Sequence, residues 1–189
     1  VFDEAAVAAM ARAEAEGMTF LHPFAPPAVV AGQGTVGLEI LEQIPDVDTV
    51  LVAIGGGGLI AGVATAIKAL RPTIRVVGIE PEGAPTHYAS RAAGEMVTLD
   101  AITTVAGTLA PRRTEALNFE LVSANVDELV LVSDDAMREA ARWLWFECGL
   151  AAELSGAATV AALMTGAVTV PAGSTVCALV CGAGTDGLE

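Results

Sequence analysis

The sequence has few basic residues, and lysine is almost absent. Nine Lys and Arg residues stand against 23 Asp and Glu residues, which gives a formal net charge of −14. Lys68 is the single lysine, and no basic run is longer than the pair Arg112 and Arg113. A surface of this charge repels nucleic-acid phosphates and anionic lipid head groups. We therefore expect neither nucleic acid nor a membrane surface as a partner.

Cysteine is also scarce. Cys148, Cys177 and Cys181 form an odd set without the spacing of a disulfide framework, which is typical of a reducing compartment. No basic segment followed by an apolar one opens the chain, so no secretory signal is predicted. We expect a cytoplasmic protein. The chain starts at Val1 rather than at a methionine, and we interpret this residue as a cut end.

One apolar stretch, residues 49–70, has the length of a membrane span. Four consecutive glycines interrupt it, and each weakens a helix by about 1 kcal/mol relative to Ala. We therefore interpret the stretch as two elements joined by a glycine loop.

Strand and helix patterns alternate along the chain. We expect strands at 18–22, 48–54, 74–80, 128–132 and 174–180, and helices at 3–16, 35–43, 59–70, 113–124, 134–148 and 155–164. The runs "DTVLVAI" and "IRVVGIE" are rich in β-branched residues, which is typical of strands buried on both faces of a parallel sheet. The alternation predicts an α/β fold, a doubly wound and mostly parallel sheet with helices on both faces. "PFAPPAVVAGQG", with three prolines and two glycines, is the best candidate for a domain boundary.

Gly55, Gly56, Gly57 and Gly58 follow the strand expected at 48–54. Ligands of such sheets bind beyond the carboxyl ends of the strands. The N–H groups and positive dipole of the helix that follows attract anions. A Cβ would keep an anion away from these N–H groups, so the loop predicts an anion site.

Two ligands fit an anion site at this loop. Gly56, Gly58 and Ala61 match the dinucleotide pattern G-x-G-x-x-A, and Glu80 ends the next strand, where a ribose-binding acid is expected. A single phosphate fits equally well. From these residues alone, both ligands and a plain strand–turn–helix junction stay open.

Three longer runs carry a family resemblance. "HPFAPPAVVAGQGTVGLEILEQ", "VLVAIGGGGLIAGVATAIKAL" and "VVGIEPEGAP" resemble, in order and spacing, the threonine/serine dehydratase and serine racemase family of pyridoxal-phosphate enzymes, which have the tryptophan synthase beta-like fold. The similarity continues through "ELSGAA" and "VCGAG" and covers essentially the whole chain. It implies the large domain of a fold type II enzyme, incomplete at its N-terminus. Residues 1–25 would be the tail of a small domain, and residues 26–189 the large cofactor-binding domain.

The resemblance assigns a cofactor site to one end of the expected sheet. The backbone N–H groups of Gly55 to Gly58 and of Leu59 would hold the phosphate of pyridoxal phosphate. Cys181 stands where the family places a Ser, Cys or Thr facing the pyridine nitrogen. A neutral thiol there would not stabilise a protonated pyridine, which suits elimination of a β-hydroxyl better than prolonged carbanion chemistry. Glu153, in "ELSGAA", would have a supporting role.

The resemblance also implies a cation. Glu80 and Ala84 match positions that bind a divalent cation in related racemases and dehydratases, through a carboxylate and a backbone carbonyl. Thr86 replaces the third ligand, a carboxylate, so a divalent ion, a monovalent ion or an empty site are all open. His22 and His87 are expected to be structural, with His87 in a surface segment.

The implied activity is dehydration and deamination of L-threonine or L-serine to a 2-oxo acid and ammonia by a homo-oligomer. The alternatives are a serine or related amino-acid racemase or a hydroxy-amino-acid lyase of the same family, a non-catalytic cofactor-binding module, and an NAD-binding Rossmann domain. The family's Schiff-base lysine and substrate-carboxylate loop lie upstream of this chain. Lys68 should lie roughly 15 Å from the phosphate end of its helix. We therefore expect no catalytic residue here, and expect activity only together with the missing N-terminal segment.

Overall fold

The computed structural model describes residues 2–188 and contains seven α-helices, four strands and two short 3₁₀ turns within them. The helices are α1 (Phe2–Glu16), α2 (Pro27–Gln43), α3 (Gly58–Leu70), α4 (Thr86–Ala93), α5 (Ala116–Asn125), α6 (Asp134–Cys148) and α7 (Leu154–Met164). The strands are β1 (Thr49–Ala53), β2 (Arg75–Pro81), β3 (Glu128–Val132) and β4 (Val176–Ala178). The 3₁₀ turns are η1 (Gly107–Leu109) and η2 (Asp186–Leu188).

The four strands form one sheet in the order β3-β2-β1-β4, and all its pairings are parallel. The parallel pair expected from the two apolar runs is confirmed, with Thr49 opposite Arg75 and Ala53 opposite Ile79. Parallel neighbours place the carboxyl ends of β1, β2 and β4 at one edge of the sheet.

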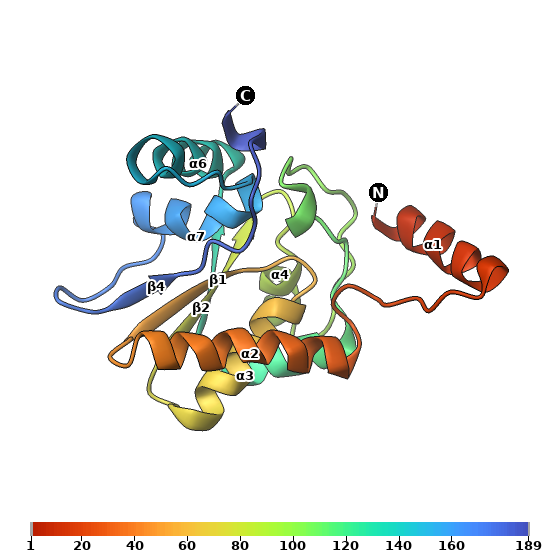
Figure 1. Ribbon diagram of the computed structural model, residues 1–189, viewed down its shortest axis with the longest axis horizontal. Coiled ribbons are helices and arrows are strands. Elements are labelled where there is room, and N and C mark those ends of the chain that lie inside the picture. The colour runs from red at the N-terminus through yellow and green to blue at the C-terminus, as the bar shows by residue number, and fades with distance from the viewer. Residues whose placement is uncertain (1, 189) are drawn as a thin grey trace.

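Alternate residues of β1 belong to two separate cores. Val50 and Val52 pack with residues of α2, α3 and α5, whereas Leu51 and Ala53 pack with residues of α6 and α7. Figure 1 shows α2 and α3 on one side of the sheet and α6 and α7 on the other. The doubly wound α/β fold is therefore confirmed.

Two local predictions were wrong, and one helix was missed. Residues 18–22 form no strand, because no described strand lies beside them to complete a hydrogen-bonded ladder. Helix α2 starts at Pro27 instead of residue 35, since a proline in the first turn of a helix loses no hydrogen bond. Helix α4 was not predicted, because its sequence, "THYASRAA", is short and largely polar.

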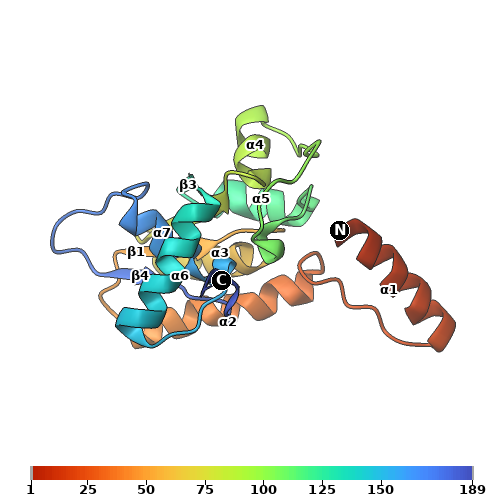
Figure 2. The same cartoon turned by 90° about the horizontal axis from the view of Figure 1, so that it is seen from above.

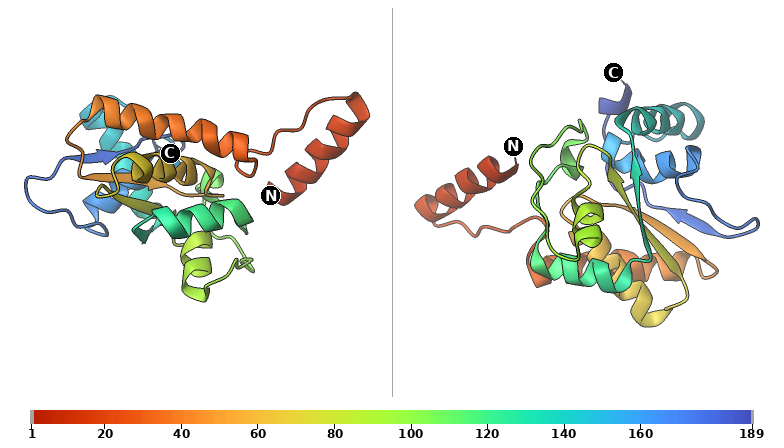
Figure 3. Two further views of the ribbon diagram at one scale, coloured as in Figure 1. Left: turned by 90° about the horizontal axis from the view of Figure 1, so that it is seen from below. Right: turned by 180° about the vertical axis from the view of Figure 1, so that it is seen from behind.

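Helix α1 stands apart from the sheet and its covering helices in every view (Figures 1, 2 and 3). The assignment of residues 1–25 to a separate domain stays a prediction. Among the residues described, no helix combines the length and apolarity needed to cross a membrane.

Helices α2 and α3 pack through glycines. A Cβ on Gly37 of α2 would lie 2.8 Å from the carbonyl oxygen of Val63, and one on Gly34 would lie 3.4 Å from that of Gly62. The two helices therefore approach each other at backbone distance. This contact fixes where the N-terminus of α3 lies.

We expect Gly37→Ala to destabilise the protein by about 1–3 kcal/mol, because the added methyl group overpacks the contact between α2 and α3. Gly32→Ala, in the same helix, is the matched control. A Cβ on Gly32 meets nothing within 4 Å, so this change should stabilise the helix by up to about 1 kcal/mol. Urea unfolding measures both, and equal midpoints would contradict the close packing.

Candidate functional site

The glycine loop, Gly55 to Gly58, joins β1 to α3 at the carboxyl edge of the sheet. Ile54 N–H still donates to the carbonyl of Ile79, at 2.8 Å, so the loop begins directly where the ladder ends. Gly57 has a φ of 93° and precedes the helix, and its carbonyl accepts the N–H of Ala61 at 2.9 Å. The first N–H groups of α3 have no partner inside the helix. They are available to an anion at this edge.

Each glycine of the loop is enclosed by another segment of the chain. A Cβ on Gly55 would lie 2.6 Å from the carbonyl oxygen of Thr108. A Cβ on Gly56 would lie 2.5 Å from the ring of Phe24. A Cβ on Gly57 would clash with Nε2 of His87, and a Cβ on Gly58 would lie 2.8 Å from Cβ of Phe24. The glycines are therefore required by neighbouring protein atoms, a reason that the sequence did not reveal.

A pocket of about 310 Å³ opens onto the glycine loop. It is lined by all six residues expected to hold the cofactor: Gly55, Gly56, Gly57, Gly58, Leu59 and Cys181. Cys181 reaches the pocket because β4 pairs in parallel with β1, so the segment after β4 ends beside the loop after β1. The structure thus gathers residues that are more than 120 positions apart in the sequence.

Polar side chains also line this pocket, namely Thr108, Glu153 and Ser155. The Thr108 hydroxyl lies 3.3 Å from each carboxylate oxygen of Glu153 and also contacts the hydroxyl of Ser155. Burial raises the pKa of Glu153 and also that of Cys181, whose thiol is therefore neutral at neutral pH although the pocket leaves it accessible. Sequence reasoning selected Glu153 and Cys181 but missed Thr108, which no local motif marks.

Glu80 lies outside this pocket and is fully buried. Its carboxylate oxygens accept the backbone N–H groups of His87 and Tyr88, each at 2.7 Å, at the start of α4. Burial raises the pKa of Glu80 to about 7, and these hydrogen bonds oppose the rise. The structure therefore does not present Glu80 to the pocket, and the acid of the dinucleotide pattern is not brought together with its glycines.

The cation expected at Glu80 and Ala84 stays a prediction. The Ala84 carbonyl accepts the N–H of Thr86 at 2.9 Å, and the Thr86 hydroxyl donates to the carbonyl of Pro111 at 2.9 Å. The residues described contain no group of three or more His, Cys, Asp and Glu side chains that could hold a metal ion.

The expected surface position of His87 was wrong. The side chain is 1% exposed and lies under the glycine loop. Glu80 binds the start of α4 and thereby draws this residue inward. Burial lowers the pKa of His87 to about 4, while the nearby carbonyl of Gly56 opposes this effect without making a hydrogen bond of good geometry.

Lys68 lies near the end of α3 that is remote from the loop. Its ammonium group is 2.7 Å from Asp127 and donates to the carbonyl of Ile74 at 2.7 Å. The side chain is 16% exposed, so this lysine is largely buried. The ion pair holds Lys68 at the C-terminal end of its helix, away from the pocket.

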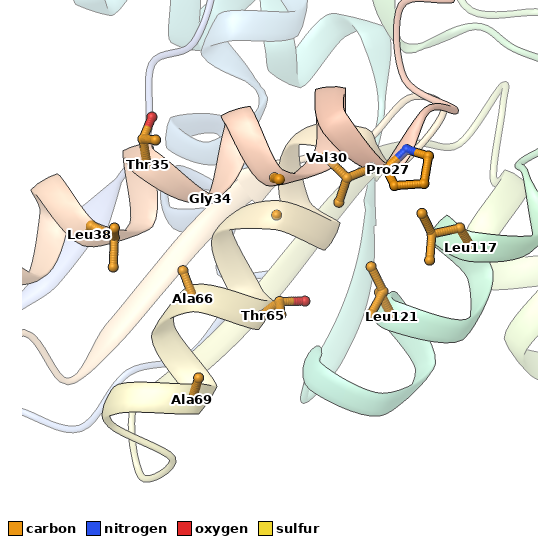
Figure 4. A pocket seen from close by; sticks show the side chains of 12 residues that line it. Pro27, Val30, Gly34, Thr35, Leu38, Thr65, Ala66, Ala69, Leu117 and Leu121 are labelled. Carbon is orange, nitrogen blue, oxygen red and sulfur yellow. The ribbon is translucent and has the colours of Figure 1, made fainter.

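A larger groove, of about 420 Å³, lies between α2, α3 and α5 (Figure 4). Its lining includes Val30, Leu38, Leu117 and Leu121, and no charged side chain contributes to it. It offers no acid or base. This groove is therefore not a candidate for the catalytic chemistry, although it is larger than the pocket at the glycine loop.

Fold and site together define an α/β domain with a pocket at the N-terminus of a helix, an arrangement suited to an anion. Residues 1–182 match the family of pyridoxal-phosphate dependent enzymes, and the chain belongs to this family. Pyridoxal phosphate (PLP) is therefore the implied cofactor, and its phosphate is the anion that the glycine loop suits.

The chain is similar to several threonine-acting proteins and racemases. It is 43% identical over 178 residues to L-threonine ammonia-lyase of Geobacter sulfurreducens, which covers 94% of this chain and 44% of that protein. Among solved structures, the threonine deaminase of T.th. is 38% identical with a TM-score of 0.85, over 92% of this chain and 64% of that one. Maize serine racemase is 36% identical with a TM-score of 0.83, over 92% and 55%. The chain thus spans less than half the length of the Geobacter relative.

Glu80 and His87 should give stability opposite dependences on pH. Folding raises the pKa of Glu80 from 4.5 to about 7, so the folded state holds the extra proton and Glu80 lowers stability as pH rises through this window. Folding lowers the pKa of His87 from 6.5 to about 4, so His87 raises stability as pH rises from 4 to 6.5.

We expect Glu80→Gln to gain stability relative to the wild type as pH rises from 4.5 to 7, and His87→Leu to lose it between pH 4 and 6.5. Each change should be at most about 3 kcal/mol. Denaturant unfolding across pH, with a chelator present to keep cations from Glu80, measures them. Glu139→Gln, at an exposed site, controls for the loss of one carboxylate. If the difference in the free energy of unfolding between each variant and the wild type is the same at every pH, the shifted pKa values of Glu80 and His87 are contradicted.

Proposed function

We propose that this chain is the cofactor-binding part of a PLP-dependent lyase, which dehydrates and deaminates L-threonine or L-serine to a 2-oxo acid and ammonia. The observation that carries the proposal is the pocket in which the glycine loop meets Cys181. The similarity to the L-threonine ammonia-lyase of Geobacter sulfurreducens supports the choice of reaction.

The residues of the pocket fit the cofactor. The N–H groups of Gly55 to Gly58 and Leu59, at the positive end of the 13-residue helix α3, would bind the phosphate. Cys181 would face the pyridine nitrogen as a neutral thiol, because burial raises its pKa. When bound, PLP supplies an electron sink for the reacting carbon. A neutral thiol there would leave the ring nitrogen unprotonated, which would suit elimination of a β-hydroxyl.

The polar side chains of the pocket would serve its substrate side. Glu153, with a raised pKa, lies against the Thr108 hydroxyl at 3.3 Å. A carboxyl group that titrates closer to neutral pH is suited to hold or release a proton there. We assign Glu153 a supporting role and Thr108 the role of orienting it.

The lysine that binds the cofactor would lie outside this chain. Lys68, the single lysine, is held by Asp127 and the carbonyl of Ile74. We therefore propose that the complete protein carries an upstream segment with this lysine, and that the 189 residues alone are inactive.

Amino-acid racemisation is the second candidate, and the likeness to maize serine racemase favours it. Both reactions begin with removal of the α-proton and would use the same phosphate site. They differ in what leaves the substrate, so the products separate them.

We also propose a homo-oligomer in the cytoplasm. Cys148, Cys177 and Cys181 are free thiols, as expected in a reducing compartment. Helix α6 exposes Trp143, 44%, and Phe146, 71%, as a subunit contact would require. The cation at Glu80 and Ala84 belongs to this proposal as well.

The complete protein loaded with PLP should release a 2-oxo acid and ammonia from L-threonine or L-serine. Coupled reduction of the 2-oxo acid measures the lyase reaction, and chiral chromatography of the amino acid measures racemisation. Racemisation without 2-oxo acid would favour the second candidate. A protein that performs neither reaction would overturn the proposal.

Gly57→Ala should weaken PLP binding to the complete protein by about tenfold or more, because a Cβ at this position displaces His87 and strains a residue with φ 93°. Gly94→Ala is the matched control. Gly94 also has a positive φ, 74°, but a Cβ there meets nothing within 4 Å, so its cost is strain of about 1–2 kcal/mol without loss of cofactor. Equilibrium dialysis measures the affinities. Equal affinities for the two variants would contradict a phosphate site at the loop.

A further inference from the structure

Two buried donors hold the carbonyl oxygen of Gly56 from behind the glycine loop. Asn118 Nδ2 donates to it at 2.9 Å, and Thr114 Oγ1 donates at 3.1 Å. Both side chains are 0% exposed, and neither lines the pocket. The carbonyl is therefore directed away from the pocket and into the protein.

The amide of Asn118 also binds the connector between α1 and α2. Nδ2 donates a second hydrogen bond, at 2.9 Å, to the carbonyl of Phe24. The ring of Phe24 packs against the loop so closely that a Cβ on Gly56 would come within 2.5 Å of it. One side chain thus fixes the connector and the loop relative to each other.

Fixing the Gly56 carbonyl also fixes the next N–H group. The peptide bonds of residues 2–188 include no cis bond, and in a trans peptide the C=O and the following N–H point in opposite directions. Because the carbonyl points toward Asn118 and Thr114, the N–H of Gly57 points toward the other side of the loop, where the pocket lies. The carbonyl of Gly57 is held in turn by the N–H of Ala61, at 2.9 Å.

Glycines on both sides allow the 56–57 peptide to rotate at little steric cost. Rotation by half a turn would direct the carbonyl oxygen, with its partial negative charge, at any anion in the pocket. It would also leave the buried donors of Asn118 and Thr114 without a partner, which is costly. These two side chains therefore select one of two orientations that the glycines alone permit.

A second observation concerns unpaired polar atoms at the same corner. Nδ1 and Nε2 of His87 and Oδ1 of Asn118 are buried, and within the described residues they have no hydrogen-bond partner. A Cβ on Gly57 would clash with the imidazole of His87 and lie 3.3 Å from Cβ of Asn118. Proteins retain unpaired buried groups mainly where geometry serves function.

We propose that Asn118 and Thr114 are positioning residues for the phosphate group of the cofactor: they lock the 56–57 peptide so that the N–H of Gly57 faces a phosphate monoester. The inference rests on the proposed function and adds the residues behind the loop. Neither side chain touches the cofactor, so both act through the orientation of one peptide.

Substitutions that remove or retain the donors test this role in the complete protein. Thr114→Val removes the hydroxyl with little change of shape, and Thr114→Ser retains it. Asn118→Leu removes both amide donors. Asn125→Leu is the matched control on α5, because the Asn125 amide binds Leu121 and Thr65 instead of the loop.

The readout is the ratio of two dissociation constants, for PLP and for pyridoxal, which lacks the phosphate. Equilibrium dialysis gives both, and circular dichroism verifies folding. We expect Thr114→Val and Asn118→Leu each to weaken PLP binding about 5- to 10-fold while pyridoxal binding stays unchanged. Thr114→Ser and Asn125→Leu should keep the wild-type ratio.

Equal losses for PLP and pyridoxal, or a wild-type ratio in Thr114→Val, would overturn the positioning role. If Asn118→Leu does not fold, the two Thr114 variants decide. A wild-type protein that binds PLP no better than pyridoxal would overturn the proposed phosphate site as well. A wild-type preference for PLP that persists in the variants would overturn this inference alone.

Discussion

Close approach at the glycine loop is the constraint on which the site depends. The connector before α2, the segment before α5 and the start of α4 all contact the loop, through Phe24, Thr108 and His87, at distances that exclude a side chain. The loop is therefore shaped from outside as much as by its own flexibility. Its conformation in turn sets the direction in which the N-terminus of α3 points.

The ends of the two central strands are coupled through α4. Glu80, at the end of β2, binds the N–H groups that open α4, and this helix carries His87 to the loop at the end of β1. Burial favours the neutral form of both side chains. The titratable groups buried behind the glycine loop are thus mainly uncharged. The main electrostatic attraction for an anion therefore lies on the pocket side of the loop.

Much of the fold follows from local patterns, and the exceptions have physical causes. Strand β3 was predicted to the residue, and the helix expected at 134–148 is α6, which Ser133 caps by accepting the N–H of Ala136 at 3.2 Å. These features depend on neighbours in sequence. The missed helix α4 is stabilised by Glu80 from another element, and a strand at 18–22 would need a partner that the described residues do not supply.

The residues of the candidate site also fall into two groups, those that the sequence indicates and those that depend on tertiary contacts. The glycine loop and Cys181 were found by motif and family resemblance, because they carry a signal in the sequence itself. Thr108, Thr114 and Asn118 carry none, since their importance comes from tertiary contacts with backbone atoms of the loop. Only coordinates distinguish such residues from ordinary threonines and asparagines.

The all-parallel pairing of the sheet also determines where the protein can be modified. Every strand starts at the edge opposite to the pocket, and the turn that precedes β4 extends beyond that edge (Figure 1). Pro171, Ala172 and Gly173 in this turn are exposed, and a Cβ on Gly173 meets nothing within 4 Å. The turn is therefore a suitable attachment point for a fluorophore or an inserted tag that reports on the protein without approaching the pocket at the glycine loop.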